Sequence, residues 1–184
     1  KAPPLPAAIV SSKIFPFLSH FYQLQMTDAR VEPVSSRRLD VGVEEAFVPK
    51  YLDRPQIVTV EAGSSELKMS EFYRWAEPLS SSFSRVLADA LSLYLPKSVV
   101  KYKTLSSENF TYTITLEINK MDAVWGRKLE LDVWWTVYKN GRVAVRARTR
   151  LSSPLGDTYE DLAGRQSALI NELAGQIAAR LAKM

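Results

Sequence analysis

The sequence predicts a single α/β domain in which a mixed β-sheet is flanked by helices, including a long C-terminal helix. Three observations support this prediction. Segments with strand-like alternation occur both before and after a helical segment, three of them in succession form a meander, and a second helical pattern closes the chain. The 184 residues suffice for one well-cored domain, and no internal repeat or linker divides them.

Short strands and turns are expected in the first half of the domain. Pro49 to Asp53 is predicted to form a turn that Pro55 closes, because a proline disfavours helix in the residue before it. The predicted strands cover residues 21–26, 39–43, 57–60 and 66–70, the last two forming a hairpin around residues 62–65.

A helix is predicted to begin at Pro78, where the missing proline N–H is not needed. It is expected to end at Pro96, and a short strand over residues 99–102 should follow. One apolar stripe at helical spacing supports this helix: Leu79, Phe83, Val86, Leu87, Ala90, Leu91 and Tyr94.

Three alternating segments, at residues 110–118, 129–137 and 143–151, predict the meander. The last two are expected to be joined by a three-residue loop, Lys139-Asn140-Gly141, with Gly141 in the left-handed conformation. A two-residue loop would mix core and charged side chains on one face, whereas the three-residue loop separates them. The pairs it predicts are Tyr138 with Arg142, Trp135 with Val145, Val133 with Ala147, Trp134 with Arg146, Asp132 with Arg148, and Glu130 with Arg150.

The final helix is expected to be capped by Asp157 or Thr158. Acidic residues in its first turn and basic residues in its last turn match the helix dipole. Its buried stripe is predicted to consist of Leu162, Leu169, Ile170, Leu173, Ile177 and Leu181.

Composition excludes several kinds of chemistry. The chain contains no cysteine, so it cannot form disulfides, zinc–thiolate sites or a thiol nucleophile. Its single histidine, His20, is expected to have a surface or capping role. No phosphate-binding glycine loop, HExxH motif or nucleophile elbow occurs, and the adjacent carboxylates Glu44 and Glu45 should point to opposite faces of a strand. We therefore expect no catalytic, cofactor or metal site and no enzyme activity.

Nucleic acid is not an expected partner. The net charge of +4 and the pI of about 9.3 are only mildly basic. The aromatic and basic residues of the meander are not accompanied by a motif of the kind that RNA-binding sheets carry.

One row of charges on the meander has two interpretations. The row comprises Arg142, Arg146, Arg148 and Arg150, which could grip phosphates or lipid headgroups, and a cation–π contact with Trp134 is expected. A row with matched acidic neighbours is more often a solvated sheet face, and this interpretation is the favoured one. Trp135 is assigned to the core, and an exposed Trp134 is typical of binding surfaces.

Residues 1–19 are predicted to form an N-terminal tether or leader ahead of a domain spanning residues 20–184. They are rich in Pro and Ala, which disfavours regular structure, so they are interpreted as a tether leading into the fold or as part of an interface, and a disordered leader is an equal alternative. The chain begins with Lys rather than Met, so we expect it to be a processed or truncated product. No run of 18 apolar residues occurs, and no signal peptide remains.

Two motifs resemble those of a known family. Residues 48–58, VPKYLDRPQIV, are followed by residues 73–79, YRWAEPL, and the earlier FYQL at residues 21–24 resembles the opening strand of the same family. The sequence is identified on these motifs as a member of the ABC-type transport auxiliary lipoproteins, the PqiC/YmbA family. The resemblance covers roughly residues 20 to 184 and agrees with the order of the predicted elements.

The resemblance implies a periplasmic lipoprotein attached to the outer membrane through a lipid anchor. Such proteins work beside an MCE-domain protein and an ABC permease and ATPase that move lipids or other hydrophobic molecules. The cysteine that would carry the lipid is absent from this chain. The family has no recognised catalytic residues, and a conduit partner would also accommodate self-association of the chain into a ring.

Within the motifs, Asp53-Arg54-Pro55 should set a rigid turn, and Trp75 with Pro78 should fix the entrance of the helix. These residues are mainly fold determinants, and some are also candidates for a partner surface. The complete candidate surface comprises Tyr51, Leu52, Arg54, Trp75, Trp134, Arg146 and Arg148.

Docking of the transport conduit at the outer membrane is the leading hypothesis. The alternative is a periplasmic lipid carrier, which would need an apolar cavity inside the fold. An enzyme acting on envelope substrates is the third hypothesis, and the lack of a catalytic constellation counts against it.

Overall fold

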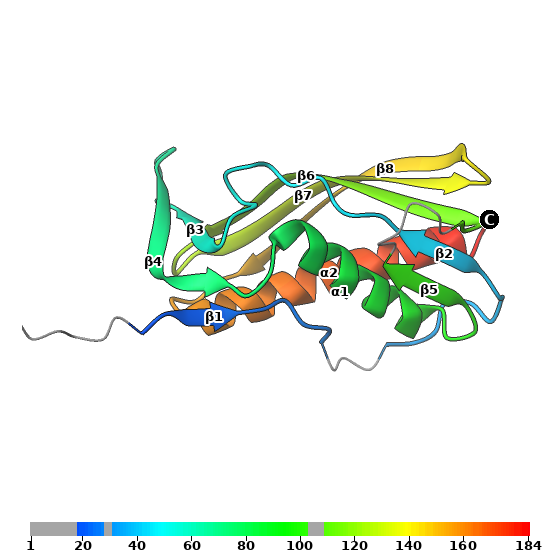
Figure 1. The fold of residues 1–184 in the computed structure, drawn as a ribbon, viewed down its shortest axis with the longest axis horizontal. Helices are drawn as coiled ribbons and strands as arrows, with labels where there is room; N and C mark the ends of the chain where they lie inside the picture. The colour runs from blue at the N-terminus through cyan, green and yellow to red at the C-terminus, as the bar shows by residue number, and fades with distance from the viewer. Residues whose placement is uncertain (1–17, 28–30, 103–108) are drawn as a thin grey trace, which may run out of the picture.

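The computed structural model describes residues 18–27, 31–102 and 109–184. It has two helices and two mixed sheets in one α/β domain, which confirms the predicted fold class (Figure 1). The elements are β1 (His20–Tyr22), β2 (Asp40–Val43), β3 (Gln56–Val60), β4 (Leu67–Trp75), α1 (Leu79–Tyr94), β5 (Val99–Tyr102), β6 (Tyr112–Val124), β7 (Lys128–Lys139), β8 (Arg142–Pro154) and α2 (Tyr159–Leu181).

The larger sheet has five strands in the order β5-β2-β6-β7-β8. Strand β2 lies between β5 and β6 and is parallel to both, whereas β6, β7 and β8 form the predicted antiparallel meander. The long strands of the meander alternate between buried and solvent-facing residues, because one face packs on the helices and the other faces water. That second face is called the outer face below.

The smaller sheet has three strands in the order β1-β4-β3. Strands β3 and β4 form the predicted hairpin, and β1 is parallel to the end of β4. Strand β4 runs on to Trp75, well past the predicted end at residue 70. Strand β1 stops at Tyr22, because the next residues leave β4 and cross to α2, where the N–H of Gln25 donates to Ser167 Oγ (3.2 Å). Leu24, in this crossing, is fully buried.

Both helices pack against one face of the larger sheet and against each other (Figure 1). Helix α1 begins at Leu79, one residue after the predicted start at Pro78, which is its N-cap, and it ends before Pro96 as predicted. Helix α2 is capped by Thr158, whose hydroxyl accepts a hydrogen bond from the N–H of Asp161 (3.1 Å). The predicted apolar stripe of α2 is buried at every position. None of the helices in the described ranges is long and apolar enough to span a bilayer.

The turn between β7 and β8 differs from the prediction. It is a two-residue turn in which Asn140 (φ 49°) and Gly141 (φ 76°) are both left-handed, so that Lys139 pairs with Arg142 and Tyr138 with Val143. A bulge at Ala144 then shifts the register, and Trp135 pairs with Ala147, Trp134 with Arg148 and Asp132 with Arg150. The predicted three-residue loop and its pairs are therefore wrong, although Gly141 is left-handed as expected.

The molecule is elongated, and its two ends are built from different elements (Figure 1). One end, called the entry end here, holds β1, β3, β4 and the start of α2. The C-terminus lies at the opposite end, beside β2, β5 and the β7–β8 turn. Helix α2 runs along this axis and, with 23 residues, spans about 35 Å.

Candidate functional site

The two sequence motifs at residues 48–58 and 73–79 meet at the start of α1. Asp53 Oδ1 accepts a hydrogen bond from the N–H of Ser80 (3.1 Å), in the first turn of the helix. The N–H of Trp75 donates to the carbonyl of Pro55 (2.7 Å). A carboxylate at a helix N-terminus satisfies an otherwise unpaired N–H and favours the helix dipole. The motifs therefore form a junction that fixes the entrance of α1.

Leu52 and Trp75 belong to this junction and not to the surface. Their side chains are only 5% and 6% exposed, respectively, and both lie in the hydrophobic core. Arg54 lies beside Met69 of β4, and its Nε is buried without a hydrogen-bond partner in the described part of the chain. These three candidate surface residues thus lie away from the outer face of the meander.

Tyr51 connects the first motif to the outer face of the larger sheet. Its hydroxyl donates a hydrogen bond to Asp122 Oδ1 (3.0 Å) on β6. Desolvation, followed by the charge of Asp122, raises the pKa of Tyr51, so the phenol stays protonated and acts as a donor. Lys120 Nζ lies 3.6 Å from Asp122 Oδ2 and 2.9 Å from Glu130 Oε2. These ion pairs extend the polar network from β6 to β7.

A second polar cluster on the outer face is centred on Asp132. Its carboxylate accepts two hydrogen bonds from Arg148 (2.7 and 2.6 Å) and one from Arg150 (3.2 Å). The hydrogen bonds from Arg148, above all, lower the pKa of Asp132 to about 2. Asp132 and Arg148 were predicted to lie directly opposite each other, and they instead contact each other as diagonal neighbours on β7 and β8. Arg148 is therefore already paired within the protein.

Arg146 and Arg148 both lie over the ring of Trp134, but Arg146 is the more exposed of the two. Its guanidinium lies over the ring of Trp134 at 5.3 Å, and its separation from Glu117 is 3.9 Å. The side chain of Arg146 remains 61% exposed. The expected cation–π contact is present, and Arg146 is available to a partner in a way that Arg148 is not.

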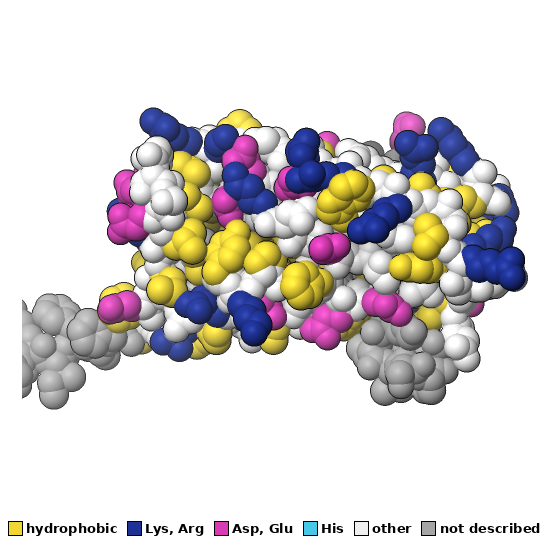
Figure 2. Space-filling view, turned by 90° about the horizontal axis from the view of Figure 1, so that it is seen from above, with side chains coloured by type: hydrophobic (Ala, Val, Ile, Leu, Met, Phe, Trp, Pro, Cys, Tyr) yellow, Lys and Arg dark blue, Asp and Glu magenta, His cyan; other side chains and the backbone are white. Residues whose placement is uncertain are grey.

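Trp134 and Arg146 line a shallow groove of about 380 Å³ on the outer face. The groove is open to solvent and combines aromatic, aliphatic and charged side chains. On this side of the molecule, basic and acidic side chains are interleaved with hydrophobic ones (Figure 2). The residues that line the groove are Phe47, Thr115, Leu116, Glu117, Trp134, Thr136, Tyr138, Val143 and Arg146.

Phe47 is the most exposed of the large apolar groove residues that lie outside the candidate surface predicted from the sequence. The segment after β2 continues beside β6, where the N–H of Phe47 donates to the carbonyl of Leu116 and its carbonyl accepts from the N–H of Ile118 (both 2.9 Å). In this extended segment Ala46 and Val48 are buried, so alternation turns Phe47 outward and leaves it 67% exposed. The alternation itself was the signal that could have identified it.

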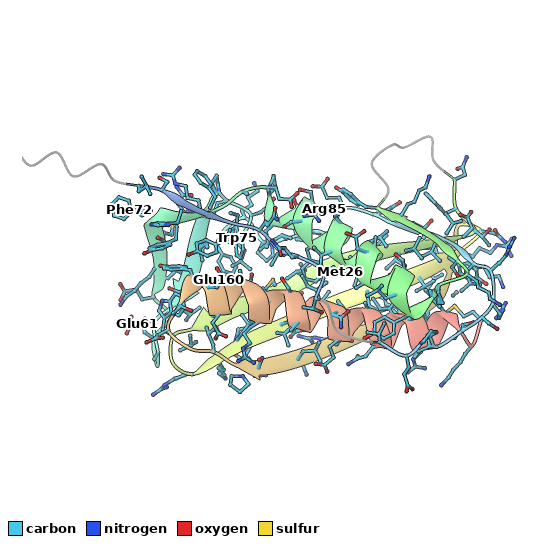
Figure 3. The ribbon with its side chains drawn as sticks, turned by 90° about the horizontal axis from the view of Figure 1, so that it is seen from below. Met26, Glu61, Phe72, Trp75, Arg85 and Glu160 are labelled. Carbon is cyan, nitrogen blue, oxygen red and sulfur yellow. The ribbon has the colours of Figure 1, made fainter. Side chains whose placement is uncertain are left out.

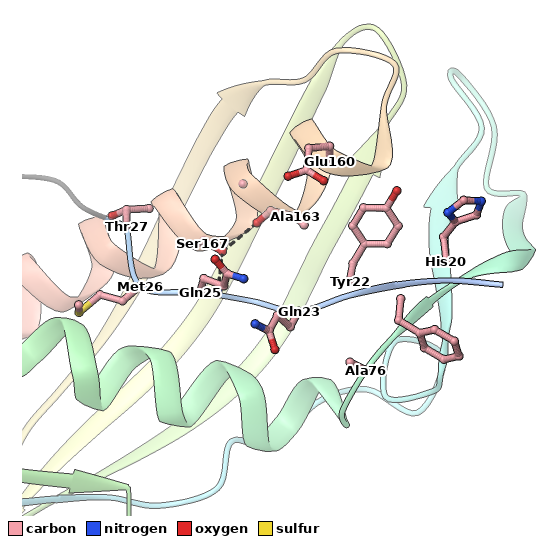
Figure 4. Close-up of a pocket in the computed structure, with 12 residues that line it drawn as sticks. His20, Tyr22, Gln23, Gln25, Met26, Thr27, Ala76, Glu160, Ala163 and Ser167 are labelled. Atoms are coloured by element: carbon pink, nitrogen blue, oxygen red, sulfur yellow. Dashed lines mark hydrogen bonds between the residues drawn. The ribbon is translucent and has the colours of Figure 1, made fainter. Parts of the chain in front are cut away.

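A larger groove of about 720 Å³ lies between residues 20–27 and the first half of α2 (Figure 4). Polar side chains dominate its lining, among them Gln23, Gln25, Glu160 and Ser167. His20, at its margin, is exposed and stacks on Tyr73 (5.1 Å between ring centroids). Over the described ranges, no group of three or more His, Asp or Glu residues is arranged to hold a metal ion.

Solved structures of other proteins share this fold. A crystal structure of an uncharacterized protein superposes with a TM-score of 0.67 at 20% identity, covering 90% of this chain and 97% of the other. A Xanthomonas campestris protein of the DUF330 family gives a TM-score of 0.64 at 14% identity, covering 89% and 93%. At these identities the similarity shows a shared fold alone. None of the curated proteins matches the sequence.

The sequence itself matches the model of one protein family over residues 22–178. That range contains both motifs, all strands from β2 to β8, and nearly all of α2. The family is described as the lipoprotein component that assists ABC-type transport. This chain, whose motifs build the α1 junction, therefore belongs to the ABC-type transport auxiliary lipoprotein family.

Proposed function

We propose that this protein is a non-catalytic accessory lipoprotein of an MCE/ABC-type system for lipids or other hydrophobic molecules, and that it docks the periplasmic conduit at the outer membrane. The family supports an accessory role in transport. The observation that carries the docking role is the outer-face groove, where Phe47, Trp134 and Arg146 are presented together on a rigid sheet. Aromatic residues and arginine are enriched among the residues that dominate binding energy at protein interfaces.

The proposed partner is an MCE-domain protein, which works with the ABC permease and ATPase. The groove suits a protein partner because it pairs apolar contact area with one exposed cation, Arg146, and one exposed acid, Glu117. Charged groups at the margin of such a patch select the partner and its orientation. Self-association of the chain into a ring is compatible with this role.

A lipid carrier is less well supported. Carriers enclose their ligand in an apolar cavity that removes most of its surface from water. The two grooves described above are both open to solvent, and the larger is lined mainly by polar side chains. An acyl chain would gain little from leaving water in such an environment.

The anchoring scheme assigns residues 1–19 to a tether and residues 20–184 to the docking domain. A lipid attached ahead of residue 1 would hold the domain at the periplasmic face of the outer membrane. Anchoring of this kind supplies affinity for the membrane without a membrane-spanning helix.

The test is affinity purification of the full-length lipidated precursor from native membranes, with mass spectrometry of the co-purifying proteins. Recovery of an MCE-domain protein is expected. Phe47→Ala and Trp134→Ala should each lower that recovery roughly tenfold, the effect of losing about 1.4 kcal/mol of binding free energy.

Val99→Ala is the control, because Val99 is an exposed apolar residue (53%) on β5 that does not line the groove and lies at the opposite end of the molecule from β1 and β4. Recovery with Val99→Ala should equal that of the wild type. If an MCE-domain protein is recovered equally with all three variants, the groove is not the docking surface. If the chain is purified alone with stoichiometric lipid, the carrier replaces the docking proposal.

A further inference from the structure

The entry end of the molecule exposes large apolar side chains. Leu18 is 71% exposed and Phe21 is 65% exposed, and both lie where the described chain begins. Leu67 and Met69, in β4, are 40% and 55% exposed. These four side chains are called the entry-end apolar residues. Strand β1 and the β3–β4 hairpin, which carry three of them, lie together at this end (Figure 1), where Figure 3 also labels Phe72 and Glu61.

A stack of aromatic rings supports this end from within. Tyr73 of β4 stacks on Tyr159 at the start of α2, with ring centroids 4.0 Å apart, and on His20 of β1 on its other side. The ring of Trp125, in the β6–β7 turn, meets the edge of Tyr159 at 4.9 Å. These ring contacts join β1, β4, the start of α2 and the β6–β7 turn. Phe21, Leu67 and Met69 therefore lie on strands that are packed against the rest of the domain.

Charge at the entry end is mixed. Lys68 is paired with Glu61, and the remaining charged groups of the hairpin and β4 include Glu66, Glu71 and Arg74. Such a set gives no excess of positive charge that would draw the end to an anionic surface. Among the described residues of the entry end, apolar burial is therefore the main attraction toward a membrane, and it acts equally toward a zwitterionic surface.

We propose that the entry-end apolar residues insert into the headgroup region of the membrane to which the chain is anchored. The inference rests on the proposed N-terminal lipid anchor. Residues 1–17 precede the described chain at this end, and 17 residues span at most about 60 Å. Of the two ends of the molecule, the entry end is therefore the one that the tether holds closest to the bilayer.

Tethering makes a weak contact sufficient. Once the chain is anchored, contact between the entry end and the bilayer is an intramolecular event with a high effective concentration. The contact would orient the long axis away from the membrane and present the outer-face groove at a fixed height above it. The elements at the opposite end, including the β7–β8 turn, would face the periplasm.

The absence of cysteine from the chain permits a direct test with single-cysteine variants. Phe21→Cys and Met69→Cys are labelled with an environment-sensitive NBD fluorophore, and Val99→Cys and Val143→Cys serve as controls. The two control positions are 53% and 61% exposed and lie away from β1 and β4. Each full chain carries an oligohistidine tag ahead of residue 1 and is attached to phosphatidylethanolamine–phosphatidylcholine vesicles through a nickel-chelating lipid.

Attachment should shift the NBD emission to the blue at positions 21 and 69 and leave it unchanged at positions 99 and 143. Adding anionic phosphatidylglycerol should not strengthen the response. With NBD at position 21, the double substitution Leu67→Ser/Met69→Ser should lower the ratio of inserted to non-inserted label roughly tenfold. Moving the tag behind residue 184 should abolish the response, because the opposite end is then held at the membrane.

Three results would overturn the proposal. They are an unchanged emission at positions 21 and 69, an equal shift at all four positions, and a shift that appears only when an MCE-domain protein is added. The last result would assign the entry end to a protein interface. Because the expected response needs vesicles and no MCE-domain protein, failure of this assay leaves recovery of the MCE-domain protein intact, and failure of docking leaves the vesicle response intact.

Discussion

Asp132 is the residue on which the outer-face charge row depends, because one carboxylate serves both Arg148 and Arg150. Its pKa is lowered to about 2 from an ordinary 3.8, so its ionised form is favoured by folding. The stabilisation is present above pH 4 and is lost as the pH falls from about 4 toward 2. We expect about 1 kcal/mol from this linkage, because solvent at the sheet surface screens the pairs.

Urea unfolding of the wild type and of Asp132→Asn at several pH values measures this contribution. The difference in unfolding free energy between the two proteins should be greatest near pH 6 and should shrink as the pH approaches 2. A difference that stays constant over this range would mean that Asp132 contributes through packing or neutral hydrogen bonds, and the assigned pKa would be wrong.

Gly42 in β2 is required for a different reason. A Cβ at this position would lie 2.4 Å from Cδ2 of Phe110, so the ring or the strand must move. We expect Gly42→Ala to destabilise the protein by about 1–3 kcal/mol, the usual cost of overpacking. Gly42→Ala should cost less when it is introduced into Phe110→Ala than when it is introduced into the wild type. Strictly additive effects in urea unfolding would contradict the proposed clash.

At the scale of elements, the β7–β8 hairpin tests the observed turn. Gly141 has a φ of 76°, and a side chain there is strained whatever the space around it. Gly141→Ala should lower the unfolding free energy by about 1 kcal/mol.

Gly164, in the interior of α2, has open space around it, so Gly164→Ala should raise stability by about 0.5–1 kcal/mol. Equal effects of the two substitutions would contradict this account.

Alternation in sequence predicted which face each side chain occupies but not its partner. The predicted and observed registers of β7 and β8 differ by two residues, and side chains repeat with a period of two. Trp135 therefore falls on the core face and Trp134 on the outer face in either register. The bulge at Ala144 depends on the twist and close pairing of the strands, which a hydrophobic pattern does not encode.

The candidate site was predictable only in part, for a similar reason. Trp134 lies on β7 and Arg146 on the neighbouring strand β8, so alternation along each strand was enough to place both side chains on one face. Phe47 joins them through the path of the chain after β2, a contact between distant segments that local patterns do not specify. Trp75 was predicted from the sequence to help fix the entrance of α1, but the hydrogen bonds that do so, from Trp75 to Pro55 and from Ser80 to Asp53, join separate segments and were not predictable from local patterns.

At the scale of the whole molecule, the proposed boundary between tether and domain can be tested by truncation. Removing residues 1–17 should change the unfolding free energy by less than about 0.5 kcal/mol, in the range of surface changes. Removing residues 1–24 should cost about 3 kcal/mol or more. It deletes β1, whose Tyr22 carbonyl accepts from the N–H of Ala76 (2.8 Å), and the fully buried side chain of Leu24.

Urea unfolding of the two truncated chains provides the comparison, and vesicle binding provides a second readout. The shorter deletion should keep the fold. It should lose attachment to vesicles and to membranes in cells, because the truncation removes the proposed anchor together with the tether. If it destabilises the protein as much as the longer deletion, residues 1–17 contribute to the folded domain and are not a tether. The proposed orientation would then fail as well, since the entry end would no longer be held to the bilayer by a linker that is independent of the fold.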